Sequence, residues 1–166
     1  KITVGGVTAT VNYEIAYVTI TDADVTVKDL AYTYNGEQLH PEMIITVDGK
    51  TLIKDEDYTV SYSDNINAGT ATVTITGIGN YGGTIEKTFT INAKTLIASN
   101  VADVAVQTYT GSAIKPSFHV YDGTMKLTEK TDYSVSWKNN KDAGTATATV
   151  KFKGNYKDAK SETVSF

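Results

Sequence analysis

Apolar and polar side chains alternate over short runs of the chain, and the clearest run is found twice. In its first copy, Tyr58, Val60 and Tyr62 alternate with small hydroxyl residues. The alternation resumes in 70–76, after a loop at 64–69 that is rich in Asp, Asn and Gly. A period of two places one face of a strand on a core and the other in water. The pattern predicts two antiparallel strands joined by a turn.

The second copy lies 75 positions further on, at the distance that separates Tyr58 from Tyr133. This spacing holds from Tyr34 and Tyr109 to the Asn-Tyr pairs that end at Tyr81 and Tyr156. Roughly a third of the aligned positions match without a gap, which indicates one unit used twice. The shared core and turn positions include Tyr58 and Tyr133, Tyr62 and Trp137, and Gly69 and Gly144.

Short strand patterns with turn signals every 8 to 12 residues fill both copies, and no segment has a sustained helical period. The sequence therefore predicts an all-β chain of two tandem antiparallel β-sandwich units at 19–92 and 93–166. Residues 1–18 align with the hairpin that ends the first unit, so we interpret them as a β-hairpin from the end of a preceding repeat. No Gly, Pro or Ser run interrupts 92–94, which favours a short, stiff connection between the units and an elongated particle.

Composition excludes several classes of protein. Lys and Arg number 15 against 19 Asp and Glu, and the net charge of −4 has the wrong sign for a nucleic-acid surface. Cysteine is absent, which rules out disulfides, thiolate chemistry and cysteine-based zinc sites. No apolar run approaches the roughly 18 residues of a membrane span. The chain starts at Lys1 without Met, and we interpret it as a fragment whose targeting signals lie outside it.

Tyrosine is unusually frequent, with 11 residues against 4 Phe and 1 Trp. Exposed rings can stack on sugar rings, and tyrosine is also an ordinary strand residue. Tyr62 and Trp137 share the register of Val60 and Val135, which favours core packing over a sugar-stacking role. The candidate sugar-binding residues are Tyr32, Tyr34, Tyr109 and Tyr121.

Acidic clusters at 55–57 and 22–24 are the candidates for calcium ligation. They lack EF-hand spacing, and only Asp57 recurs in the second copy, as Asp132, so a turn or capping role is favoured. His40 and His119 fall at non-equivalent positions without a metal-ligand or triad motif. We predict no catalytic residue, no metal site and no cofactor.

The repeat has a recognisable signature in the segments 57–62, 68–75 and 79–84, which the second copy matches through 143–147 and 154–156. It departs after Tyr156, where Lys-Asp-Ala replaces Gly-Gly-Thr. The signature resembles the bacterial immunoglobulin-like repeats found in tandem in large secreted and wall-attached proteins of Gram-positive bacteria. The resemblance implies immunoglobulin-like sandwiches in an extracellular setting. It transfers no catalytic residue, because the shared positions are those of turns and core.

The sequence is compatible with two functions. The first is a non-catalytic structural or adhesive module that spaces or presents other domains of a larger surface protein, secreted or attached to the cell wall. Its partners would be neighbouring domains of the same chain and a host or microbial surface protein or polysaccharide, with no nucleic acid and no membrane insertion. The alternative is a carbohydrate-binding module that recognises polysaccharide through exposed Tyr side chains. An enzyme is not expected.

Overall fold

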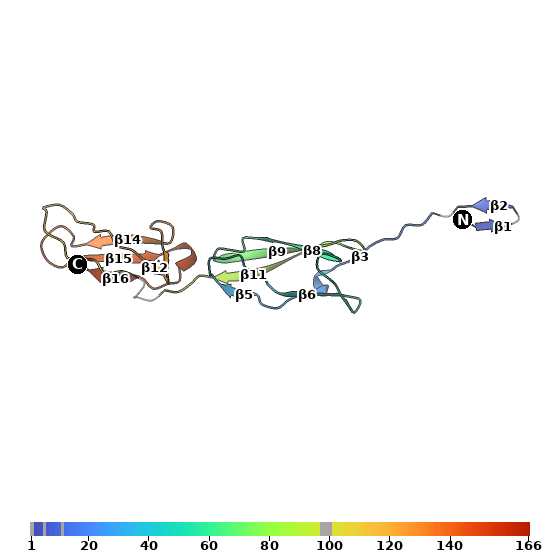
Figure 1. Cartoon of the computed structure of the whole chain (residues 1–166), viewed down its shortest axis with the longest axis horizontal. Helices are drawn as coiled ribbons and strands as arrows, with labels where there is room; N and C mark the ends of the chain where they lie inside the picture. Colours follow the sequence, from blue (N-terminus) through green and yellow to red (C-terminus); the bar gives the residue numbers. More distant parts are fainter. Residues whose placement is uncertain (1, 5, 11, 97–100) are drawn as a thin grey trace. The chain divides into compact units, whose positions relative to one another are not determined.

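The computed structural model describes residues 2–4, 6–10, 12–96 and 101–166, and these residues form an all-β structure without α-helix (Figure 1). The all-β prediction is confirmed. These described residues also include two 3-10 turns, η1 at Asp22–Asp24 and η3 at Gly154–Tyr156. The strands are β1 Ile2–Val4, β2 Val7–Ala9, β3 Val18–Thr19, β4 Val25–Val27, β5 Ala31–Thr33, β6 Met43–Val47, β7 Lys50–Thr51, β8 Tyr58–Ser63, β9 Gly69–Gly77, β10 Tyr81–Gly82, β11 Thr84–Asn92, β12 Tyr121–Asp122, β13 Met125–Lys126, β14 Tyr133–Lys138, β15 Thr147–Phe152 and β16 Glu162–Ser165.

The chain divides into two compact units. Unit 1 comprises 1–28, 42–62 and 73–87, and unit 2 comprises 29–41, 63–72 and 88–166. Strands β8, β9 and β11 have residues in both units. The sequence-based domain boundaries at 1–18, 19–92 and 93–166 stay a prediction.

The strands assemble into several sheets (Figure 1). A four-stranded sheet has the order β5-β11-β9-β8, and three-stranded sheets have the orders β4-β6-β7 and β14-β15-β16. In the second copy of the repeat, β14 pairs antiparallel with β15 from Tyr133 opposite Phe152 to Lys138 opposite Thr147. This is the hairpin that the alternating pattern predicts. By contrast, β5 joins β11 in parallel, with Ala31 opposite Thr90.

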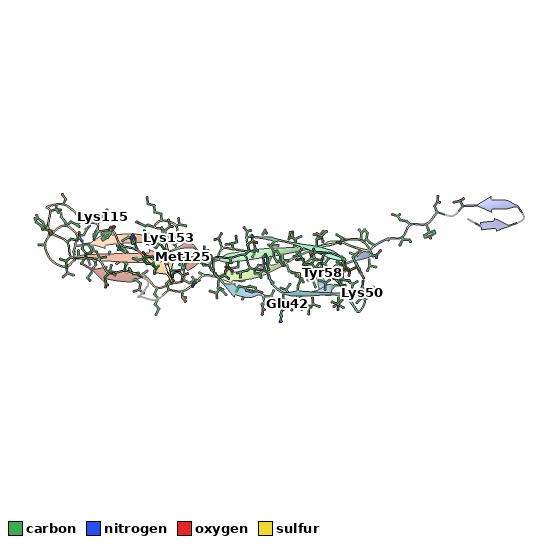
Figure 2. The ribbon with its side chains drawn as sticks, viewed as in Figure 1. Glu42, Lys50, Tyr58, Lys115, Met125 and Lys153 are labelled. Carbon is green, nitrogen blue, oxygen red and sulfur yellow. The ribbon has the colours of Figure 1, made fainter. Side chains whose placement is uncertain are left out.

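The core of unit 1 contains residues from two different sheets, the arrangement of a β-sandwich. Strands β4 and β6 provide one side, and β8 and β9 provide the other. Tyr58, labelled in Figure 2, is 6% exposed and belongs to this core. Its buried members are Ile20, Val25, Ile45, Val47, Leu52, Tyr58, Val73 and Ile75.

Unit 2 has its own core, and half of its buried members stand at positions equivalent to buried members of the unit 1 core. Tyr133, the counterpart of Tyr58, is 5% exposed, and Val150, the counterpart of Ile75, is fully buried. Tyr156 from η3 and the partly buried Tyr34 also pack here. The buried members are Leu96, Val101, Val120, Leu127, Tyr133, Val150, Phe152 and Tyr156.

The recurring aspartate has the same structural task in both copies. The Asp57 carboxylate accepts a hydrogen bond from the Ile53 amide at 3.0 Å, and Asp132 accepts one from the Thr128 amide at 2.8 Å. Each aspartate thereby closes the turn that precedes β8 or β14. The predicted turn-capping role is confirmed.

One asparagine in the loop after β8, and one in the loop after β14, bonds a segment that is distant in the sequence. We call these two contacts the asparagine clamps. The Asn65 side chain donates to the Leu39 carbonyl at 3.0 Å, while the Leu39 amide donates to the Asn65 carbonyl at 2.8 Å. Asn140 and Ile114 form the same pair of bonds at 2.8 and 2.7 Å. The sequence assigned these asparagines to local turns, but each clamp spans 26 residues.

Strand β5 of the first copy has no counterpart in the second. Residues 102–119 contain no strand, although the repeat predicts one near 106–108 to match β5. In the first copy, the rings of Tyr32 and Phe89 lie edge to face with their centroids 5.7 Å apart, which fixes β5 on β11. Their counterparts are Gln107 and Val164, so this aromatic contact is absent. The expectation of strands at all equivalent places is wrong here.

The clamps generate a stability prediction. Asn65→Ala leaves the carbonyl of the half-buried Leu39 without its side-chain donor, and the free energy of unfolding is expected to fall by about 1–3 kcal/mol. For Asn140→Ala, a loss in the same range is expected. Urea denaturation measures both, with the exposed Asn12→Ala as the matched control. Losses below about 0.5 kcal/mol in both clamp variants would contradict the assigned role.

Candidate functional site

The four candidate tyrosines do not form a common platform. Tyr32, Tyr34 and Tyr121 are half-buried, and each lies edge to face with another ring. Their partners are Phe89 at 5.7 Å, Tyr156 at 5.7 Å and His119 at 6.2 Å between centroids. Rings engaged in this way offer less free surface to a sugar. Tyr109, by contrast, is 61% exposed.

Tyr109 borders a hollow of about 150 Å³ in unit 2. Apolar side chains of Val106, Ile114 and Phe166 line part of it, and the loop 139–144 lines the rest. Of the positions predicted from sequence, the structure brings Tyr109 and Gly144 together here. The hollow combines an exposed ring with backbone groups of a loop, so it is suited to binding a small group that carries hydrogen-bonding atoms.

Trp137 is half-buried rather than buried. Its ring lies edge to face with Phe118 and Phe166, at centroid distances of 6.0 and 5.6 Å. A second hollow, of about 410 Å³, is lined by Trp137, Phe118 and Glu129 among other residues. Tyr62, its counterpart, is half-buried and packs against the core of unit 1. Both rings therefore pack against other apolar side chains, and Trp137 also has access to open space.

The glycines predicted at turns have backbone conformations that favour glycine. Gly69 has φ of 154° and Gly144 has φ of 142°. These positive values are strained for residues with a Cβ atom. The two equivalent glycines thus share a conformation as well as a position in the repeat.

Acidic clusters have structural partners in the structure. Asp24 accepts hydrogen bonds from the side chain and backbone of Thr21, which lower the pKa of its carboxyl group. Asp22 pairs with Lys87 at 2.6 Å. His40 and His119 are exposed. Among the residues that the structure describes, no group of three or more acidic or histidine side chains is placed to hold a metal ion.

A polar network in unit 2 has no signal in the repeat pattern. The Lys94 ammonium lies 2.7 Å from both carboxylate oxygens of Asp122, whose side chain is only 12% exposed. The Tyr156 hydroxyl donates to Asp122 at 3.1 Å. The counterparts of Lys94 and Asp122 in the first copy are Thr19 and Val47. Since the network is unique to the second copy, comparison of the copies could not reveal it.

Next to this network, the Asn155 side chain makes two hydrogen bonds with the loop 64–69. The Ala68 amide donates to Asn155 Oδ1 at 2.8 Å, and Asn155 Nδ2 donates to Asn67 Oδ1 at 3.0 Å. The Asn155 carbonyl also accepts from the Lys94 amide at 2.8 Å. Together with the Tyr34–Tyr156 ring contact, we call this cluster the loop–turn joint. All of its residues belong to unit 2, and its chemistry is suited to fixing a position rather than to catalysis.

Comparison of the chain with protein-family models, curated proteins and solved structures finds no match. Within the described ranges, no helix is long and apolar enough to cross a membrane.

The network predicts a loss of stability at alkaline pH. Burial, followed by the hydrogen bond to Asp122, raises the pKa of Tyr156, and burial also raises the pKa values of Tyr58 and Tyr133. A tyrosine whose pKa is higher in the folded state than in the unfolded state stabilises the fold while it is protonated. This stabilisation is fully present below the unfolded-state pKa of about 10, and it is lost as pH rises through the folded-state pKa.

The free energy of unfolding is therefore expected to be flat from about pH 7 to 9 and to fall above about pH 10. In Tyr156→Phe, the free energy of unfolding is expected to decrease less above about pH 10 than in the wild type. Tyr13→Phe, at a position 83% exposed, is the matched control. Chemical denaturation at a series of pH values measures the effect, and identical pH profiles for wild type and Tyr156→Phe would refute it.

Proposed function

We propose that the chain is a non-catalytic structural module of a large extracellular protein, made of two tandem immunoglobulin-like sandwiches that space or present other domains. The supporting observation is that residues shared by both copies do the same structural work twice. The aspartates cap turns, the asparagines clamp loops, and Tyr58 and Tyr133 fill cores. These shared side chains are thus accounted for by folding.

The two hollows described above support a non-catalytic role. The hollow beside Tyr109 contains one carboxylate, Asp142, and the hollow beside Trp137 contains one, Glu129. Glycoside hydrolysis requires two carboxyl groups flanking the scissile bond. Neither hollow provides that pair.

An extracellular, surface-attached setting is the second part of the proposal. It is supported by the likeness of the duplicated segments to repeats of secreted and wall-attached proteins of Gram-positive bacteria. The partners would be neighbouring domains of the same polypeptide and a surface protein or polysaccharide of a host or microbe. The net charge of −4 argues against nucleic acid as a partner.

A carbohydrate-binding module is the second candidate, and one observation favours it. Tyr109 is 61% exposed and borders a hollow, so one ring is available to stack on a sugar face. The other three candidate tyrosines are half-buried and lie against neighbouring rings. A single available ring provides much less surface than a row of them would.

Titration with soluble starch, xylan and cellulose oligomers distinguishes the two candidates. The intrinsic fluorescence of the protein is expected to show no saturable change up to millimolar sugar. The absence of saturation at that concentration means a binding free energy weaker than about −4 kcal/mol. Saturable binding that Tyr109→Ala abolishes without a change in melting temperature would favour the carbohydrate module instead. Tyr13→Ala, which removes another exposed ring, is the matched control.

A further inference from the structure

The loop–turn joint is complete on one loop of the duplicated unit and unoccupied on the other. In the first copy, Ala68 is half-buried and its amide is bonded to Asn155. Its counterpart Ala143 is exposed, and its amide has no hydrogen-bond partner in the part of the chain that the structure describes. Tyr34 is half-buried against Tyr156, whereas its counterpart Tyr109 is 61% exposed. These two positions, covered in the joint, are therefore uncovered in the second copy.

The uncovered loop retains the conformation of the covered one. The second asparagine clamp holds Asn140 on Ile114 as the first holds Asn65 on Leu39. Gly144 repeats the positive φ of Gly69. The loop is thus prepared for a contact without needing one to fold.

The hydrogen-bonding groups of the uncovered loop also match those of the joint. In the joint, an asparagine side chain accepts from the Ala68 amide and donates to the oxygen of Asn67. The second loop presents the Ala143 amide as donor and the Asp142 carboxylate as acceptor. An asparagine side chain has both an acceptor oxygen and donor hydrogens, so it can satisfy the two together. Asp142 makes the acceptor charged, which strengthens such a bond.

Unit 1 presents a second turn of the kind that occupies the joint. The Asn80 carbonyl accepts from the Val18 amide at 2.9 Å, as the Asn155 carbonyl accepts from Lys94 at 2.8 Å. Asn80 is exposed, whereas Asn155 is half-buried in the joint. The repeat thus contains a Gly-Asn-Tyr turn that can be presented to a partner.

We infer that the surface formed by Tyr109, Asp142 and Ala143 is the docking site for the Gly-Asn-Tyr turn of a further copy of this repeat. The turn's asparagine bonds the Ala143 amide and the Asp142 carboxylate, and its tyrosine packs on Tyr109. The inference deepens the proposed spacer function and rests on it, because such a contact lets the module be extended by repetition. The hollow bordered by Tyr109 is then a protein contact rather than a sugar site.

The test extends the chain by one repeat and follows two amides by NMR hydrogen exchange. One extended chain repeats residues 92–166 directly after Phe166, and a second repeats 16–92 there, so each adds a Gly-Asn-Tyr turn. In the 166-residue chain, the Ala68 amide is expected to exchange slowly and the Ala143 amide rapidly. In at least one extended chain, Ala143 is expected to exchange at least about tenfold more slowly.

Matched asparagine variants identify the cause of the protection. Asn155→Ala in the original chain is expected to release the Ala68 amide, and the same substitution in the added turn is expected to release Ala143 alone. Rapid exchange of Ala143 in both extended chains, with Ala68 still protected, overturns the inference. That result leaves the spacer proposal intact, because the sugar titration tests it separately.

Discussion

A backbone carbonyl that is withdrawn from water needs a hydrogen-bond donor inside the protein, and the asparagine clamps meet this requirement twice. Asn65 and Asn140 use a side-chain donor and a backbone acceptor to close a ring with Leu39 and Ile114. An uncompensated buried carbonyl would cost a few kcal/mol, comparable to a large part of the stability of a small domain. The clamps hold the hairpin loops in one conformation, and the loop–turn joint depends on that conformation.

Features that repeat along the chain could be predicted from the sequence. Alternation with a period of two predicts the β14–β15 hairpin, and the recurrence of Asp57 as Asp132 predicts a turn-capping role. Both follow from local geometry, which neighbouring residues determine. The all-β class follows for the same reason, because every strand pattern is short and bounded by turn residues.

Features that depend on distant or unique contacts could not be predicted. Predicting that Asn65 bonds Leu39, 26 residues away, requires knowing which segment lies beside the loop. The network of Lys94, Asp122 and Tyr156 occurs once, so the internal comparison that identifies the repeat gives it no signal. Of the candidate site, sequence identified Tyr109 as an aromatic residue but could not distinguish it from the half-buried Tyr34, because burial depends on the joint.

The parallel pairing of β5 with β11 has a mechanical consequence. Strand β11 ends at Asn92 and continues directly into the segment 93–96, so a pull through that segment along the axis of β11 is transmitted directly to the strand. The ladder bonds between Ala31–Thr33 and Thr90–Asn92 are slanted, as in any parallel pair, and link the two strands sideways to this direction. They are loaded in shear and must break together rather than one after another. Resistance to pulling is then governed by the rate of unfolding, so a polypeptide of modest equilibrium stability can still transmit force.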